Sequence, residues 1–150
     1  MLRTDFALFR EDGSLTAVVE AKRVSNTSAE WAALFRRNIL AHGGFASAEF
    51  FLIVTPDSMY LWEHADSAAV PVPPDRVIPT RPLLEPYFSR AHATPESVSG
   101  SGFEMIVWFW LSDLSEPGSE VSRAAREHGF SGAGLVEALH GGRIEYEAAA

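Results

Sequence analysis

Two carboxylates and one ammonium near the start of the chain could carry out metal-dependent chemistry. They belong to Asp5, Glu20 and Lys22. Carboxylate oxygens are ligands that Mg²⁺ prefers, and a lysine beside a bound cation can orient a water molecule for attack. Lys22 is the one lysine among 12 basic residues. A compact ammonium suits a water nucleophile better than a planar guanidinium does, so these residue types favour hydrolysis.

A β-hairpin would bring these residues together. Two β-rich runs, residues 3–10 and 15–22, flank Asp12-Gly13, a dipeptide that favours a two-residue type I′ turn. With that turn, Asp5 lies directly opposite Glu20. Lys22 follows Glu20 by two residues and therefore points to the same face of the strand. The spacing predicts a cradle for Mg²⁺ with a lysine beside it.

Two simpler interpretations of this spacing stay open. Glu20 and Lys22 could form an exposed ion pair on a solvated strand, which would stabilise the fold very little. Alternatively, Asp5 and Glu20 could hold a structural ion, which predicts metal-dependent stability without access for a phosphate.

The pattern resembles the PD-(D/E)XK motif of the restriction-endonuclease-like nuclease superfamily. Asp5 is followed, after fourteen intervening residues, by Glu20-Ala21-Lys22, and Thr4 stands where the family usually has proline. The hairpin, the next helix and an apolar strand over residues 50–55 match the order of the family's core, so the resemblance covers residues 3–63. Residues 55–62 and 99–104 also resemble small stand-alone bacterial members of the superfamily.

The resemblance implies a division of labour among these residues. Asp5 and Glu20 would hold one or two Mg²⁺ ions, with Mn²⁺ as an alternative, and the carbonyl of Ala21 would be a further metal ligand. Lys22 would orient and help to deprotonate the attacking water, while the metal neutralises charge on the phosphate. The implied activity is hydrolysis of phosphodiester bonds in DNA, leaving a 5′-phosphate, in a defence or mobile-element system.

The chain departs from the family pattern upstream of the motif. The family's core begins with a helix and strand that often supply another acid, whereas Asp5 follows Met1 almost at once. A helix predicted over residues 103–114 is the best substitute, and Glu104 near its start could face the metal. Ser101 and Glu104 also match a capping box, in which Glu104 would bond the backbone instead.

Basic residues on the helix after the hairpin could bind the substrate. A capping box at Thr27 and apolar residues at helical spacing predict a helix from Thr27 to His42. The resemblance implies that Arg36 and Arg37 on this helix contact phosphates near the site. The alternative is that both residues lie on a solvated helix flank.

The remaining elements follow from hydrophobic periodicity and turn residues. Apolar runs predict strands over residues 50–55 and 58–62, and a Pro-rich stretch over 64–82 favours an extended connector. Short helices are predicted over 83–91, 120–128 and 133–140, and a closing strand over 143–147.

These elements predict one α/β domain over residues 1–150, with a mixed β-sheet flanked by helices. A restriction-endonuclease-like core would occupy residues 1–63, a connector and short helix 64–102, and a helical cover 103–150. The family's upstream helix would be missing or replaced by the helix over 103–114. That helix is apolar nearly all round, so Met105, Trp108 and Phe109 could form an interface.

Composition limits the functions that remain. The net charge is −8, yet residues 1–44 carry a net +1 and are the region that suits a polyanion. With no cysteine and five histidines without ligand spacing, a metal site would use mainly oxygen ligands. The longest apolar run, Met105–Leu111, is too short to span a membrane, and Asp5 comes too early for a signal peptide. A cytoplasmic protein without a membrane partner is therefore expected.

Two functions of different classes follow from these observations. The first is a Mg²⁺-dependent nuclease with DNA as substrate, acting as a homodimer or in a larger system. It predicts that Asp5, Glu20 and Lys22 converge in an open cleft flanked by Arg36 or Arg37. The second is an inactive nuclease-fold module that binds a protein partner or dimerises through the helix over 103–114. It predicts a splayed or enclosed triad and an exposed aromatic patch.

Overall fold

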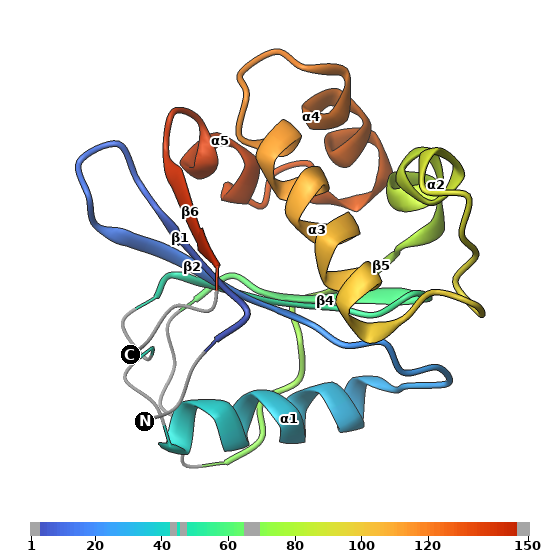
Figure 1. The fold of residues 1–150 in the computed structure, drawn as a ribbon. Coiled ribbons are helices and arrows are strands. Elements are labelled where there is room, and N and C mark those ends of the chain that lie inside the picture. Colours follow the sequence, from blue (N-terminus) through green and yellow to red (C-terminus); the bar gives the residue numbers. More distant parts are fainter. Residues whose placement is uncertain (1–3, 43–44, 46–47, 65–69, 147–150) are drawn as a thin grey trace.

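A mixed β-sheet with helices on both faces forms the body of the protein (Figure 1). The structure, a computed structural model, describes residues 4–42, 45, 48–64 and 70–146. Within these residues six strands lie in the order β5-β4-β3-β2-β1-β6. The expectation of an α/β fold with a mixed sheet flanked by helices is confirmed. The strands are β1 (Phe6–Phe9), β2 (Leu15–Ala21), β3 (Phe50–Val54), β4 (Ser58–Trp62), β5 (Arg76–Pro79) and β6 (Arg143–Tyr146).

The strand directions follow from the connections between them. β1 and β2 form an antiparallel hairpin, and helix α1 (Ala29–His42) then carries the chain across to β3, which runs parallel to β2. The other pairs, β3 with β4, β4 with β5 and β1 with β6, are antiparallel. β3 is buried along its whole length, as its uninterrupted apolar sequence predicts.

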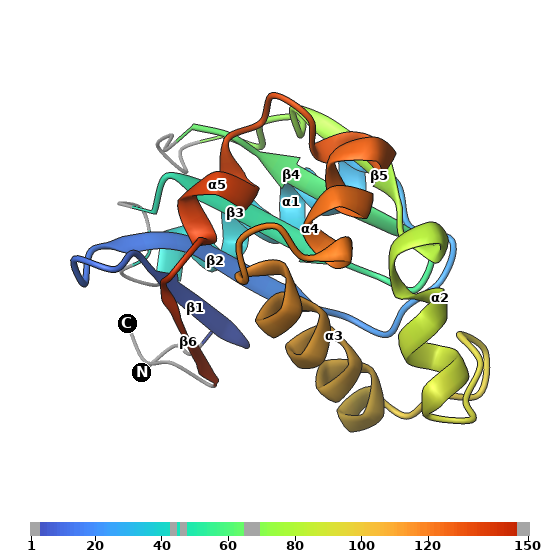
Figure 2. The same cartoon turned by 90° about the horizontal axis from the view of Figure 1, so that it is seen from above.

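The two faces of the sheet are covered by different parts of the chain. α1 packs alone on one face, whereas the helices from the second half of the chain cover the other (Figures 1 and 2). Alternate residues of β2 point to opposite faces, so Val18 and Glu20 lie on the α1 side while Val19 lies among the other helices. The helices opposite α1 are α2 (Arg81–Arg90), α3 (Gly100–Leu114), α4 (Glu120–Ala125), the π-turn η1 (Arg126–Phe130) and α5 (Leu135–Leu139).

The two long helices begin at different caps from those that the sequence predicts. At α1 the hydroxyl of Ser28 accepts a hydrogen bond from the amide of Trp31 at 3.1 Å, while the Thr27 hydroxyl bonds that of Tyr60 at 2.7 Å. At α3 the hydroxyl of Ser99 accepts from the amide of Gly102 at 3.0 Å. α3 therefore starts at Gly100, earlier than the predicted residue 103.

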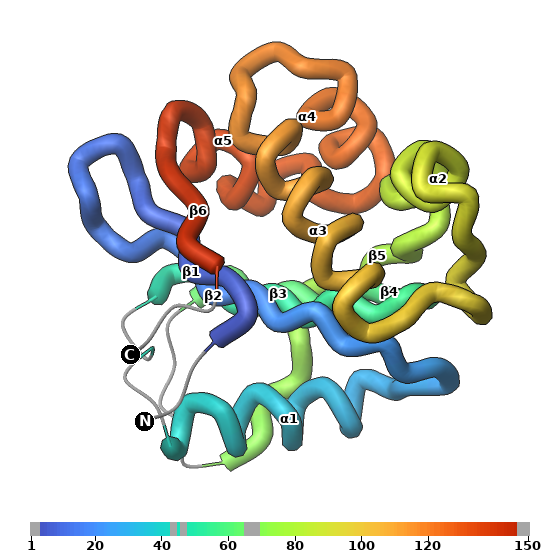
Figure 3. The backbone as a smooth tube through the Cα atoms, in the orientation of Figure 1, coloured from blue at the N-terminus to red at the C-terminus, as the bar shows by residue number. Residues whose placement is uncertain are grey.

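Both edges of the sheet come from segments that the sequence places less well. β5 lies inside the stretch predicted to be a connector, because Ile78 is buried against the core and an edge strand tolerates Pro79. β6 lies at the end of the chain, where the sequence predicts a closing strand, and the structure pairs it with β1 (Figure 3). Residue 3 of the first predicted strand and residue 147 of the last lie outside the described residues.

Candidate metal-dependent active site

The β1–β2 hairpin turns through three residues, not two. The amide of Gly13 donates to the carbonyl of Arg10 and the amide of Arg10 donates to the carbonyl of Ser14, both at 2.8 Å. Gly13 has a φ of 89°, which is favourable for glycine. This is a three-residue loop with glycine in the left-handed region, so the predicted two-residue type I′ turn is wrong.

A bulge in β2 compensates for the longer loop. Phe9 pairs with Leu15 but Leu8 pairs with Ala17, so Thr16 is an extra residue on β2. Beyond the bulge the register is the predicted one. One residue past the last pair of β1, Asp5 therefore lies across from Glu20, where the sequence placed it.

The side chains of Asp5, Glu20 and Lys22 converge at this end of the hairpin. Nζ of Lys22 lies 3.5 Å from Oδ2 of Asp5 and 3.7 Å from Oε2 of Glu20. The amide of Asp5 also donates to Oε2 of Glu20 at 3.4 Å. An ammonium between two carboxylates offsets their mutual repulsion, so the arrangement is stable as a unit.

Glu20 is the buried member of the group. Its side chain is 2% exposed, and Oε1 has no hydrogen-bond partner among the described residues. Burial, together with the neighbouring Asp5 carboxylate, raises the pKa of Glu20 to about 8. At neutral pH in the absence of a cation, Glu20 therefore holds a proton. A buried oxygen without a partner among the described residues and a strongly raised pKa mark Glu20 as a candidate functional residue.

Lys22 connects the buried carboxyl to solvent. Its side chain is 35% exposed, and Nζ lies 5.6 Å from the centre of the Phe35 ring on α1. Its backbone amide donates to the carbonyl of Val54 at 2.9 Å, which ties the end of β2 to β3. The ammonium therefore lies close to both carboxyl groups and to an aromatic ring, on a side chain that is partly exposed.

The backbone of Ala21 also faces the group. Its amide donates to Oδ2 of Asp5 at 2.9 Å. The N–H and C=O of one strand residue point to the same edge, so the Ala21 carbonyl is directed toward β1 as well. This is the direction that the predicted role of Ala21 as a ligand requires.

Thr4 and Arg23 are the neighbours of Asp5 and Lys22 in the sequence. Thr4 is buried and its hydroxyl donates to the carbonyl of Val19 at 3.3 Å. Arg23 follows Lys22 and lines a polar pocket with Asn26 and Asp57; its Nε donates to the carbonyl of Val98. The sequence signal for both residues was their position directly beside the motif.

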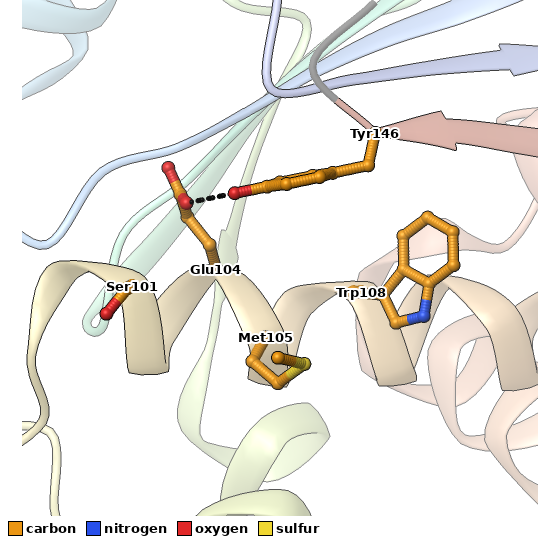
Figure 4. Close-up of a pocket in the computed structure, with 5 residues that line it drawn as sticks. All are labelled: Ser101, Glu104, Met105, Trp108 and Tyr146. Carbon is orange, nitrogen blue, oxygen red and sulfur yellow. Dashed lines mark hydrogen bonds between the residues drawn. The ribbon is translucent and has the colours of Figure 1, made fainter.

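Glu104 does not join this group. It lies on α3, which covers the face of the sheet opposite α1, and its carboxylate accepts a hydrogen bond from the hydroxyl of Tyr146 at 2.9 Å (Figure 4). Within the described residues no three acidic or histidine side chains are grouped so as to hold a metal ion. The expectation that Glu104 supplies a third acid is corrected, since Tyr146 engages it and Ser99 provides the helix cap.

The two arginines of α1 differ in their surroundings. Arg36 is 3% exposed and its guanidinium lies 5.2 Å from the Trp62 ring centre and 5.8 Å from that of Phe51. Arg36 therefore packs into the α1 side of the core and does not present its charge to a phosphate at the surface. Arg37 is partly exposed, with Nε buried and without a hydrogen-bond partner among the described residues. Of the two arginines, Arg37 alone keeps the exposure that phosphate binding needs.

No protein-family model, curated protein or solved structure matches this chain. None of the helices in the described part of the chain has the length and apolarity needed to cross a bilayer.

Proposed function

We propose that this chain is a Mg²⁺-dependent nuclease of the PD-(D/E)XK type that hydrolyses phosphodiester bonds in DNA. The observation that carries the proposal is the convergence of the Asp5 and Glu20 carboxylates with the Lys22 ammonium, which lies 3.5 Å and 3.7 Å from them. A solvated ion pair between Glu20 and Lys22 is disfavoured, because Glu20 is buried.

The path of the chain supports the same proposal. The hairpin that carries the motif leads into α1 and then into β3, which is parallel to β2 and buried. This is the element order that the resemblance implies for a restriction-endonuclease-like core. The acidic and basic residues therefore lie on the elements where that family carries its motif.

The donor set fits a hard divalent cation. Asp5 and Glu20 would hold Mg²⁺ through carboxylate oxygens, and the Ala21 carbonyl is directed to the same place. Oε1 of Glu20, buried and without a partner among the described residues, is an oxygen that a cation would satisfy. Two carboxylates are sufficient for Mg²⁺, which usually keeps several waters and binds substrate phosphate oxygens as well.

The residues of the chain would share the remaining tasks. When bound, Mg²⁺ supplies Lewis-acid stabilisation of the charge that develops on the phosphate. Glu20 would give up its proton when a cation occupies the site, because positive charge favours the carboxylate. Lys22 would orient the attacking water, and its ammonium would stabilise negative charge on the phosphate oxygens.

The charge distribution predicts a weak electrostatic grip on duplex DNA. Exposed or partly exposed arginines pair with glutamates at Arg10–Glu49, Arg76–Glu63, Arg81–Glu96 and Arg126–Glu137. Arginines that are already paired with glutamates neutralise few phosphates, so few counterions leave the DNA. We therefore expect weak binding to duplex DNA with a shallow dependence on salt concentration. A single-stranded or flexible substrate suits this surface better than a long rigid duplex.

The test is cleavage of supercoiled plasmid and single-stranded DNA in Mg²⁺ or Mn²⁺. Wild type should cleave, and both Glu20→Gln and Lys22→Met should lose at least about a hundredfold in rate. Glu63→Gln is the matched control, because Glu63 is also a partly buried carboxylate with a cationic partner, Arg76, in a different part of the sheet. Equal cleavage by all four proteins would reveal a contaminating nuclease and refute the proposal, as would no cleavage by folded wild type on either substrate.

A specific observation favours the second candidate, a nuclease-fold module that binds a partner through α3. Met105 is 56% exposed and Phe109 is 52% exposed on the outer face of that helix. Exposed apolar side chains at helical spacing are typical of an interface. Folded wild type that binds no divalent cation and cleaves no DNA would favour this candidate over the nuclease.

A further inference from the structure

The outer edge of β6 is regular, and no described strand pairs with it. β6 forms the margin of the sheet, beside α3 (Figure 2). It contains no proline and pairs with β1 without a bulge. Proteins usually protect a sheet edge that no neighbouring strand covers, because such an edge can pair with another chain.

The opposite edge of the same sheet shows what protection looks like in this protein. β5 ends in Pro79, which has no amide to donate. The Arg76 guanidinium reaches across to the carbonyls of Gly129 and Ser131 at 3.0 Å and 2.7 Å, which holds η1 beside that strand. Among the described residues, β6 has no proline, and no arginine side chain holds another segment beside its outer edge. The β5 edge is therefore protected, and the β6 edge lacks both forms of protection within this part of the chain.

We propose that β6 pairs antiparallel with β6 of a second copy of this chain, centred on Ile144. The two sheets would then continue through the interface about a two-fold axis. In an antiparallel pair, two opposed residues both point their N–H and C=O groups toward the partner strand, or both point them away from it. This direction alternates along a strand. When both strands have the same sequence, two opposed residues must therefore lie an even number of positions apart. The axis must therefore pass through a residue of β6 and not between two residues.

The charges of Arg143 and Glu145 indicate which residue of β6 lies on the two-fold axis. A centre at Arg143 would oppose two arginines, and a centre at Glu145 would oppose two glutamates. Only a centre at Ile144 places Arg143 across from Glu145 of the other copy, and the two-fold axis makes this pair twice. Both charged residues lie on the face of the sheet that also carries Ala7 and Phe9, their partners in β1. Within one chain Nη2 of Arg143 lies 3.6 Å from Oε2 of Glu145, and both side chains are exposed, so in the dimer each charge would exchange this partner for its counterpart across the axis.

The other face of β6 supplies apolar surface to the same interface. Ile144 is partly buried against the core, and Tyr146 lies against Trp108 with ring centres 6.4 Å apart. Tyr146, Trp108 and the exposed Met105 line a largely apolar pocket beside the strand (Figure 4). Because a few strand residues alone pair only marginally, we expect side chains of the second copy to cover this pocket.

Sedimentation equilibrium over a range of protein concentrations tests the proposal. Wild type should be a dimer that dissociates on dilution. Arg143→Glu or Glu145→Arg should each raise the dimer dissociation constant at least about tenfold, because each opposes like charges twice. Mixing the two variants in equal amounts should restore dimers. In the mixed pair the introduced glutamate of one chain meets the introduced arginine of the other, and the two unchanged residues, Glu145 and Arg143, also meet as opposite charges.

The matched control is Arg123→Glu, a charge reversal at an exposed position on α4, which should leave the dissociation constant unchanged. Circular dichroism and thermal unfolding establish that every variant is folded. A monomeric wild type at all concentrations would overturn the proposal. So would dimers that withstand both reversals, or a mixture of reversals that stays monomeric. This proposal does not depend on hydrolysis and stands or falls separately from the nuclease.

Discussion

Glu20, on the interior strand β2, combines two properties that both disfavour its charged form. It is buried, and the acidic side chain of Asp5 lies beside it, since both carboxyl groups approach the Lys22 ammonium. Either property alone would disfavour the charged carboxylate, and together they raise its pKa to about 8. The fold tolerates this because Lys22 adds a positive charge to the group and because the carboxyl can hold a proton.

The raised pKa of Glu20 predicts how stability depends on pH. The pKa rises from 4.5 to about 8 on folding, so between these values the folded protein binds more protons than the unfolded chain. The contribution of protonated Glu20 to the free energy of unfolding is fully present below about pH 4.5 and is lost as the pH rises to about 8. Glu20→Gln cannot ionise, so its free energy of unfolding should fall less than that of wild type between about pH 5 and 8, by roughly a few kcal/mol.

Urea denaturation at several pH values measures this difference. Glu63→Gln should follow the pH profile of wild type, because Glu63 lies beside Arg76, away from the site. Parallel curves for wild type and Glu20→Gln would contradict the assignment of a proton to Glu20.

The surroundings of Arg36 predict that it stabilises the fold, whereas the resemblance implied that it contacts phosphates. Its guanidinium packs against Phe51 and Trp62, and its side chain is buried. We expect Arg36→Ala to lower the free energy of unfolding by about 2–4 kcal/mol, through lost packing and lost cation–π contacts. Arg123→Ala, at an exposed position on α4, should change it by less than about 0.5 kcal/mol. Similar values for the two variants in urea denaturation would place Arg36 at the surface.

At the scale of elements, two features of the hairpin have opposite effects on its register, and together they leave Asp5 across from Glu20. The loop is one residue longer than predicted, and the bulge at Thr16 adds one residue to β2. The register past the bulge is therefore the one that a two-residue turn would have produced.

A substitution at Gly13 tests the backbone geometry of the three-residue loop. The φ of Gly13, 89°, is unfavourable for any residue with a Cβ, although the space around it is empty. Gly13→Ala should therefore cost about 1 kcal/mol through backbone strain alone. Gly100→Ala is the matched control, since its Cβ also meets open space but its φ is not positive and it begins α3. Chemical denaturation should find the control neutral or stabilising, and equal costs at both positions would argue against the three-residue loop.

At the scale of the whole molecule, the proposed cation site would couple binding to folding. Asp5 lies just before β1 and Glu20 lies on β2, so a cation held by both exists only when the hairpin is formed. A ligand that binds the folded state alone stabilises it by mass action. Global unfolding is therefore a readout of the site that requires no catalysis.

Mg²⁺ should raise the melting temperature of wild type. A tenfold excess over Kd stabilises by about 1.4 kcal/mol, or roughly 3–6 °C for a domain of this size. Glu20→Gln should abolish the shift and Lys22→Met should keep it, and excess EDTA should reverse it. Glu104→Gln should also keep the full shift, because Glu104 is engaged by Tyr146. Loss of the shift in Glu104→Gln would return that residue to the metal site, and no shift in wild type would count against the bound cation.

The sequence by itself determined the hairpin, its faces and the long helix that follows. Strand alternation puts Glu20 and Lys22 on one face, and a turn between two β-rich runs brings Asp5 opposite them. These relations are local, so a pattern of a few residues is sufficient to specify them. Even the error in the turn left the pairing of Asp5 with Glu20 unchanged, because the bulge at Thr16 restores the predicted register.

Only the tertiary structure decided what lies around that hairpin. The burial of Arg36 depends on Phe51 and Trp62 from other strands, and the separation of Glu104 from the site depends on which face α3 covers. β5 becomes a strand despite its proline because the edge of β4 is open and Ile78 fits the core. Each outcome depends on contacts between segments far apart in the sequence, and such contacts leave no periodic or local pattern.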